Sequence, residues 1–206
     1  MINSATSQQS KKNCKVNFVY LLTFAYAIST FASGILVPIY AFYVQKIGGG
    51  ILETSWAFGL YSILYGLGTM MIHKMQWTHK YRMHLLWIGW LMWLLSISIY
   101  FMVSTLTVLY VSQVIGALGD AIYEPVFDGE FSRQVAADPS SGWAFFNGTT
   151  SIFSGIASLL GGVIATVFGF EALLFCVLAV GSISFFLIVY YSRQNGYKVQ
   201  ENTAAE

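Results

Sequence analysis

Residues 85–95 read LLWIGWLMWLL, eleven residues without a charged side chain, in which only Gly89 is not large and apolar. A strand of a membrane β-barrel would alternate apolar and polar residues. This stretch is apolar at every position, so no face of it suits water. It therefore predicts a helix that crosses a lipid bilayer.

The composition of the whole chain agrees with a bilayer environment. Of the 206 residues, 56% are hydrophobic and 9% are charged, whereas soluble domains carry about 25% charged residues. So few charges cannot cover a water-exposed surface, which excludes a soluble enzyme. A net charge of +1 without a basic tract excludes a nucleic-acid partner. The expected partner is the lipid bilayer.

Uncharged stretches set the number of spans. A spanning helix needs about 20 mostly apolar residues, and the long stretch 85–119 is enough for two, with a polar break at Ser104 and Thr105. We expect an all-α integral membrane protein with a six-helix transmembrane domain at 16–192 and polar cytoplasmic tails at 1–15 and 193–206. The expected helices are approximately residues 17–44, 54–73, 84–103, 106–128, 143–168 and 170–191.

Basic residues predict the orientation. With the N-terminus inside, the outer segments hold only Lys46, and the inner segments hold Lys11, Lys12, Lys15, Lys74, Lys80, Arg82, Arg133, Arg193 and Lys198. Such an excess of basic residues marks the cytoplasmic side. Both termini are therefore expected in the cytoplasm of a multi-pass protein of the plasma (inner) membrane.

The six spans form two series of three with similar character. In the first and fourth spans, residues 34–40 (GILVPIY) loosely echo residues 119–127, which contain Pro125. The second and fifth spans are rich in small residues spaced four apart, which lets helices approach closely within or between subunits; the glycines expected to pack are Gly66, Gly155, Gly161 and Gly162. The third and sixth spans are bulky and apolar, so we expect them to face lipid. Because each series has an odd number of helices, the pattern predicts a 3+3 inverted repeat. The alternative is that any six hydrophobic helices can be sorted in this way.

Acidic residues in the fourth span are the leading functional candidates. Gln113, Asp120, Glu124 and Asp128 fall within a stripe of about 80° on a helix. An ionised carboxylate deep in lipid costs at least about 2.5–3.5 kcal/mol, so Asp120 and Glu124 imply an interior or water-filled cavity. A transporter that couples to protons or binds cations requires such carboxyl groups. Weaker candidates for the cavity wall are tyrosines on the neighbouring spans, namely Tyr20, Tyr26, Tyr40, Tyr61, Tyr65 and Tyr123, and we add Asn147 to the expected pathway.

A structural interpretation of the same acids stays open. If the fourth span ended near Asp120, Glu124 would lie among headgroups beside Lys80, Arg82 or Arg133. For Asp128 an inner-edge role is favoured, in which it holds the basic loop and forms a cytoplasmic gate with these three residues. The three histidines lack metal-ligand spacing, so neither a metal nor another cofactor is expected.

Three segments carry a family resemblance. Residues 113–125 read QVIGALGDAIYEP, residues 143–148 read WAFFNG, and residues 157–162 read ASLLGG. Together with six spans, both ends inside and a basic loop between the second and third spans, they resemble one half of a major facilitator superfamily transporter, over about residues 16–193.

The sequence departs from that family at known motif positions. Trp77 stands where the signature loop of the family has an aspartate, although Lys80 and Arg82 match its basic tail. Ser112 and Gln113 occupy the place of an arginine that many proton-coupled members have, and 157–158 replace a Gly-Pro pair of exporters. The resemblance therefore implies the fold and solute transport, but not drug–proton antiport by the usual residues.

The resemblance also implies a partner. A full member has about twelve spans, so six spans correspond to one half. A homodimer of two copies, or a second six-helix half, would restore the arrangement of the full fold.

Two functions of different classes follow. The first is secondary transport of a small solute by alternating access, with a cavity on the first, second, fourth and fifth spans. The second is a non-transporting six-helix scaffold, or an accessory half-subunit of a split transporter. The chain contains neither a phosphate-binding G-x-x-x-x-G-K-[ST] motif nor a G-x-S-x-G nucleophile motif, so we do not expect an enzyme.

Overall fold

The computed structural model describes residues 2–74, 78–103 and 105–203, and within them the side chains of 19–72, 81, 83–103 and 105–190. The described chain is all helical, with α1 (Ile2–Leu36), η1 (Val37–Ile39), α2 (Tyr40–Lys46), α3 (Ile51–Lys74), α4 (Thr78–Ile99), η2 (Tyr100–Met102), α5 (Leu106–Gln134), α6 (Pro139–Val167) and α7 (Gly169–Thr203). Six spans are long and apolar enough to cross a membrane, as expected: Val19–Lys46, Ile51–Ile72, Met83–Met102, Leu106–Gln134, Pro139–Val167 and Gly169–Tyr190.

Two prolines act differently on their helices. At Pro38 the first span leaves the α-helix, and the 3₁₀ turn η1 joins α1 to α2, because proline has no N–H to donate and its ring crowds the preceding turn. Pro125 lies inside α5, which continues to Gln134. The helix therefore does not end near Asp120, and Glu124 lies well within it, while the position of the membrane edge along α5 stays a prediction.

Short connections join the helices at the end of the bundle away from the termini. Gly48 and Gly169 have φ values of 88° and 85°, a region that residues with a Cβ rarely adopt. Gly48 turns the chain from α2 to α3, and Gly169 turns it from α6 to α7. These two turns are tight because both positions are glycine.

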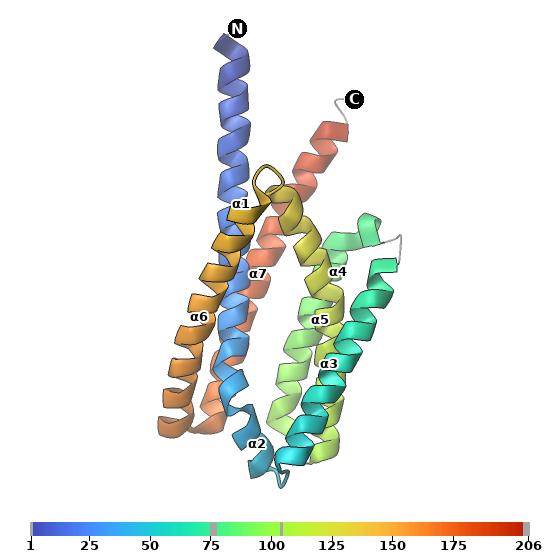
Figure 1. Cartoon of the computed structure of the whole chain (residues 1–206), viewed down its shortest axis with the longest axis vertical. Coiled ribbons are helices and arrows are strands. Elements are labelled where there is room, and N and C mark those ends of the chain that lie inside the picture. Colours follow the sequence, from blue (N-terminus) through green and yellow to red (C-terminus); the bar gives the residue numbers. More distant parts are fainter. Residues whose placement is uncertain (1, 75–77, 104, 204–206) are drawn as a thin grey trace.

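The helices pack in two groups. α1 packs mainly against α6 and α7, while α5 packs mainly against α3 and α4, and α4 meets α7 between the groups (Figure 1). This pattern stays the same if each of the first three spans is exchanged with its counterpart in the last three. It favours the inverted repeat, which stays a prediction.

Close backbone contacts hold each group together. A Cβ on Gly89 of α4 would lie 2.6 Å from the carbonyl oxygen of Gly119 on α5. On the other side of the bundle, a Cβ on Gly34 of α1 would lie 3.1 Å from the Cβ of Ala157 on α6. Small residues therefore set the distance between α4 and α5 and between α1 and α6.

The expectation that the third and sixth spans face lipid is wrong for one face of each. Trp90 and Trp93 of α4 are only 2% and 8% exposed, and the indole N–H of Trp90 donates to the carbonyl oxygen of Gly181 on α7 at 3.1 Å. The least buried spans are instead α3 and α6. Apolar side chains pack against protein and against lipid equally well, so hydrophobicity alone did not tell these faces apart.

The start of α1 and the end of α7 lie at the same end of the bundle (Figure 1). An even number of spans requires this arrangement. Which side of the membrane this end faces stays a prediction from the basic residues.

Candidate functional site

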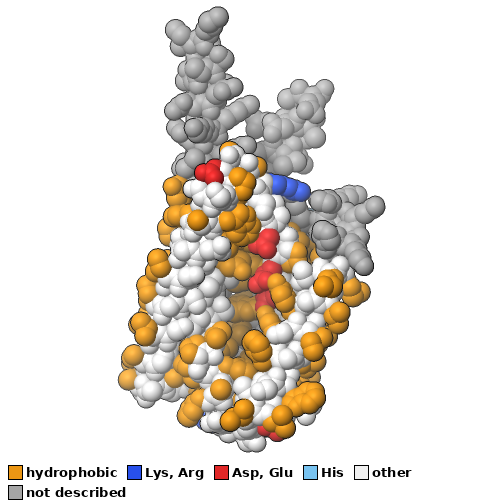
Figure 2. Space-filling model, viewed as in Figure 1, with side chains coloured by type: hydrophobic (Ala, Val, Ile, Leu, Met, Phe, Trp, Pro, Cys, Tyr) orange, Lys and Arg blue, Asp and Glu red, His pale blue; other side chains and the backbone are white. Residues whose placement is uncertain are grey.

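A cavity of about 580 Å³ lies between five of the six spans. Figure 2 shows a hollow that contains acidic side chains, on the face between α6 and α3. The cavity is lined by Tyr26, Ser29, Thr30, Ser33, Leu36, Val37 and Tyr40 of the first span, Phe58 and Tyr61 of α3, Trp90, Trp93, Ser96, Ile97 and Tyr100 of the third span, Ser112, Gln113, Gly116, Asp120, Tyr123 and Glu124 of α5, and Phe146, Asn147 and Thr150 of α6.

The seven residues expected on the solute pathway line this cavity: Tyr26, Tyr40, Gln113, Asp120, Tyr123, Glu124 and Asn147. Of the other tyrosines that the sequence suggests for the cavity wall, Tyr61 also lines it, whereas Tyr20 and Tyr65 do not belong to the lining. The cavity borders the four expected spans and also the third. The position of these residues is thus established, while their role in transport is a proposal.

Tyrosines of α3 hold the two carboxylates of α5. The hydroxyl of Tyr61 donates to the carboxylate of Asp120, and the hydroxyl of Tyr65 donates to that of Glu124. The rings of Tyr61 and Tyr65 are stacked, with centroids 6.3 Å apart. A spacing of four residues puts each pair on one helix face, so the two helices match in register. From α1, the hydroxyl of Tyr26 donates to Oε1 of Glu124 at 3.4 Å.

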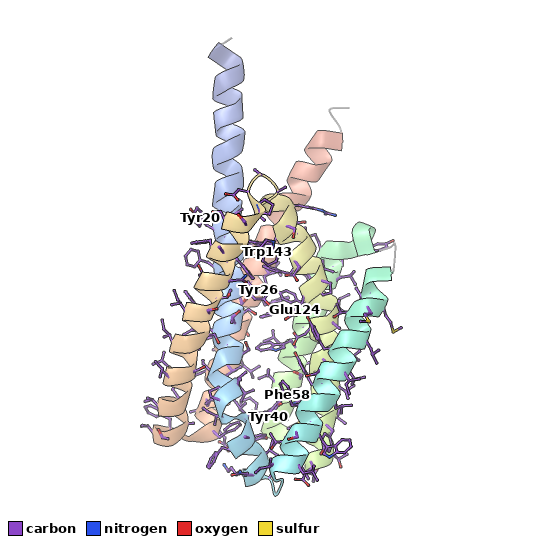
Figure 3. The ribbon with its side chains drawn as sticks, in the orientation of Figure 1. Tyr20, Tyr26, Tyr40, Phe58, Glu124 and Trp143 are labelled. Carbon is purple, nitrogen blue, oxygen red and sulfur yellow. The ribbon has the colours of Figure 1, made fainter. Side chains whose placement is uncertain are left out.

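A second polar cluster lies around Gln113. Its Nε2 donates to the hydroxyl oxygens of Tyr40 and Tyr100, at 2.7 and 3.0 Å. The hydroxyl of Tyr43 donates to the carbonyl oxygen of Tyr100 at 2.9 Å. Figure 3 shows Tyr40 toward the end of the bundle opposite to Tyr26 and Glu124. This cluster therefore ties the segment after the proline break to α5 and η2.

Aromatic rings fill the wall around the acids. The ring centroid of Tyr123 lies 5.0 Å from that of Trp90 and 6.0 Å from that of Tyr26. Tyr123 is 2% exposed, and its hydroxyl has no hydrogen-bond partner among the described residues. An unpaired buried hydroxyl costs free energy. Among the lining residues, Tyr123 is the one with a buried side-chain oxygen that has no partner in the described chain.

Sequence reasoning missed the contribution of the third span. Trp90, Trp93 and Tyr100 line the cavity. Together with Leu86 and Ile97 they form a buried row with spacings of four and three residues. Such a row marks a packed helix face, but it cannot be recognised when the residues on the other faces are equally apolar.

The expected cytoplasmic gate is described only in part. Asp128 is exposed and lies outside the cavity lining, and the side chains of Lys80 and Arg82 lie outside the described residues. Nη1 of Arg133 lies 3.8 Å from Oε2 of Glu130, a buried acid that the sequence did not single out. The gate stays a prediction.

The four glycines of the expected packing ridges have different surroundings. A Cβ on Gly161 would meet the backbone carbonyl of Ile35 on α1, whereas the positions of Gly66, Gly155 and Gly162 have no atom of the described chain within 4 Å. Of the four, only Gly161 makes a close helix contact within the described chain.

Comparison with known proteins agrees with the fold. The family model of the Major Facilitator Superfamily matches residues 22–206. No curated protein and no solved structure matches the chain. Members of the matched family are membrane transporters, which confirms the resemblance found in the sequence and supports a multi-pass transporter in general. Because the match covers nearly the whole chain, the protein belongs to the Major Facilitator Superfamily.

Proposed function

We propose that the protein moves a small solute across the plasma (inner) membrane by alternating access, with the 580 Å³ cavity as its solute site. The observation that carries the proposal is the convergence of polar and aromatic side chains from five spans on this cavity. Carboxylates inside a membrane bundle cost free energy, so their presence there indicates a functional site. A volume of this size also lies in the range of about 300–1,000 Å³ that is usual for small-molecule sites.

The proposed coupling groups are Asp120 and Glu124. Each accepts a hydrogen bond from a tyrosine of α3, and a hydrogen bond to an ionised carboxylate is about twice as strong as a neutral one. A proton bound by either acid would weaken its bond to α3. Proton binding would thereby change how α3 is held against α5, which is a physical means of coupling a proton to helix movement.

We propose that a second six-helix unit, a second copy or another chain, covers the face between α3 and α6. These are the least buried spans, and acidic side chains lie in a hollow of this face (Figure 2). An acid turned toward hydrocarbon would cost at least about 2.5–3.5 kcal/mol. Protein cover and water in the cavity remove that cost, and the open positions at Gly66, Gly155 and Gly162 allow another backbone to approach.

Reconstitution into proteoliposomes tests transport and coupling together. A pH-sensitive dye inside the vesicles reports proton movement when solutes of a panel are added outside under an imposed pH gradient. We expect that at least one solute causes a protein-dependent proton flux, and that Asp120→Asn or Glu124→Gln lowers this flux at least about tenfold. Glu171→Gln, which replaces an exposed acid at the start of α7, is the matched control and should leave the flux unchanged.

Two outcomes would contradict the proposal. If both amide variants kept the wild-type flux, the acids would be structural. If the wild-type protein moved no solute under any gradient, alone or with a co-expressed second half, the scaffold function would be the better account.

A further inference from the structure

The wall of the cavity is aromatic and acidic. Of the 23 lining residues, nine are aromatic and two are acidic, and no Lys, Arg or His is among them. Rings present a negative face to a bound ligand and attract cations within about 6 Å of their centroids. The rings and the carboxylates therefore both favour a positively charged ligand.

Many polar side chains of the wall already donate their hydrogen bonds within the protein. Five lining hydroxyls donate to backbone carbonyls of their own helices at 2.8–3.1 Å: Thr30, Ser33, Ser96, Ser112 and Thr150. Gln113 uses its amide nitrogen for two tyrosine oxygens. What these groups still offer a ligand is oxygen lone pairs, so this part of the wall presents acceptors to a ligand.

The two carboxylates keep room for a ligand. A carboxylate has about four acceptor positions. One tyrosine hydroxyl reaches Asp120, and two reach Glu124. The remaining acceptor positions of the two carboxylates suit a ligand group that donates hydrogen bonds.

We propose that this cavity selects an organic cation, namely a compound with an ammonium group and an apolar or aromatic body. The inference rests on the proposed function in that it takes the cavity as the solute site. The ammonium group donates to Asp120 and Glu124, and the body lies against the rings of Phe58, Trp90 and Trp93. An anion would meet two carboxylates and no Lys, Arg or His side chain among the lining residues. A bare metal ion would leave most of the 580 Å³ unfilled, and the described residues hold no cluster of three His, Cys, Asp or Glu side chains that could bind it.

Equilibrium binding to the protein in lipid nanodiscs tests this proposal. The probes share one skeleton and differ in charge: 2-phenylethylammonium, neutral 2-phenylethanol and anionic 3-phenylpropionate, with empty nanodiscs as the blank. Because a hydrogen bond to a charged group is worth about 1.5–3 kcal/mol, the ammonium probe should bind at least about tenfold more tightly than the other two. The double variant Asp120→Asn/Glu124→Gln should remove this preference, and Glu171→Gln should keep it.

A second pair of variants tests the aromatic part. Phe58 lines the cavity, and Trp56 lies on the same helix outside it; both side chains are well exposed, at 67% and 66%, so neither substitution threatens the fold. Phe58→Leu should weaken binding of the ammonium probe about two- to fivefold, as expected for one cation–π contact. Trp56→Leu should leave the affinity unchanged.

The outcomes separate this inference from the proposed function. It is overturned if the alcohol or the carboxylate binds as tightly as the ammonium, if the double amide variant keeps the preference, or if no ammonium binding occurs up to about 10 mM. Binding is measured without a gradient, so a protein that binds the cation but drives no flux would contradict transport alone. A protein that carries a neutral solute and ignores the ammonium probe would contradict this inference alone.

Discussion

Tyr61 on α3 donates a hydrogen bond to the carboxylate of Asp120 on α5, from 59 positions earlier in the sequence. The same arrangement recurs one helical turn further along, between Tyr65 and Glu124. One helix of the bundle is thus attached to its neighbour through the two acids that we propose as coupling groups. A change in the protonation of either acid should therefore alter how firmly α3 is held against α5.

The first prediction concerns this contact. Tyr61→Phe removes the donor and should lower the free energy of unfolding by about 1–2 kcal/mol, less than for a fully buried charged pair because Asp120 also faces the cavity. In a double-mutant cycle, Tyr61→Phe should cost much less when Asp120→Asn is already present. Unfolding in detergent measures both effects. Tyr190→Phe, at a 55% exposed ring, is the control, and additive effects of the Tyr61 and Asp120 variants would contradict the contact.

The second prediction compares two adjacent glycines of α6. Gly161→Ala places a methyl group against the carbonyl of Ile35, so α1 and α6 must separate, whereas Gly162→Ala meets open space. Overpacking of this kind costs about 1–3 kcal/mol. The melting temperature in detergent should fall clearly for Gly161→Ala and stay near wild type for Gly162→Ala. A melting temperature of Gly161→Ala equal to that of the wild type would show that α1 and α6 do not approach as described.

The third prediction concerns the uncovered face. A photo-reactive Gly155→benzoylphenylalanine should crosslink in native membranes to a second copy or to another membrane chain, because Gly155 faces space that the described chain does not fill. The same change at Leu91, which is 50% exposed on α4, should give no protein adduct. Mass spectrometry of the adducts identifies the partner. Absence of protein adducts at position 155 would show that lipid covers this face and would contradict the presence of a second unit.

The fourth prediction concerns orientation. Reporters placed after Lys12, near residue 79, after Ser140 and after Lys198 should all report the cytoplasm, and a reporter at Gly49 should report the outside. The basic residues favour this topology. Labelling of a cysteine at position 79 from outside would show that the topology is wrong.

The spans could be predicted from the sequence because their signal is local. A run such as residues 85–95 is apolar whatever its neighbours are, and Pro38 breaks its own helix for a local reason. The sequence predicts a fourth span that ends near residue 128, and helix α5 continues to Gln134. The charged residues at this end indicate a membrane edge, whereas a helix can continue past such an edge.

Only the α5 part of the site could be predicted with its geometry, because the spacing of polar residues along a single helix shows which of them share a face. Asp120, Glu124 and Gln113 share a face by spacing alone. Their partners on other helices depend on tertiary packing: Tyr61 and Tyr65 were only weak candidates, and Trp90 and Trp93 were assigned to lipid. The glycines show the same limit, because Gly161 and Gly162 look alike in sequence and differ only in what lies opposite them.

The access of water to the middle of the cavity tests the central claim most directly. Thr30 lines the cavity, and Thr30→Cys can be made with Cys14→Ser and Cys176→Ser, while Ala32→Cys, at a fully buried position of the same helix, is the control. Alternating access predicts that a membrane-impermeant thiol reagent modifies position 30 from either side of sealed vesicles, without leakage of a small dye, and does not modify position 32. Modification of position 30 from one side only, or from neither, would contradict transport through this cavity.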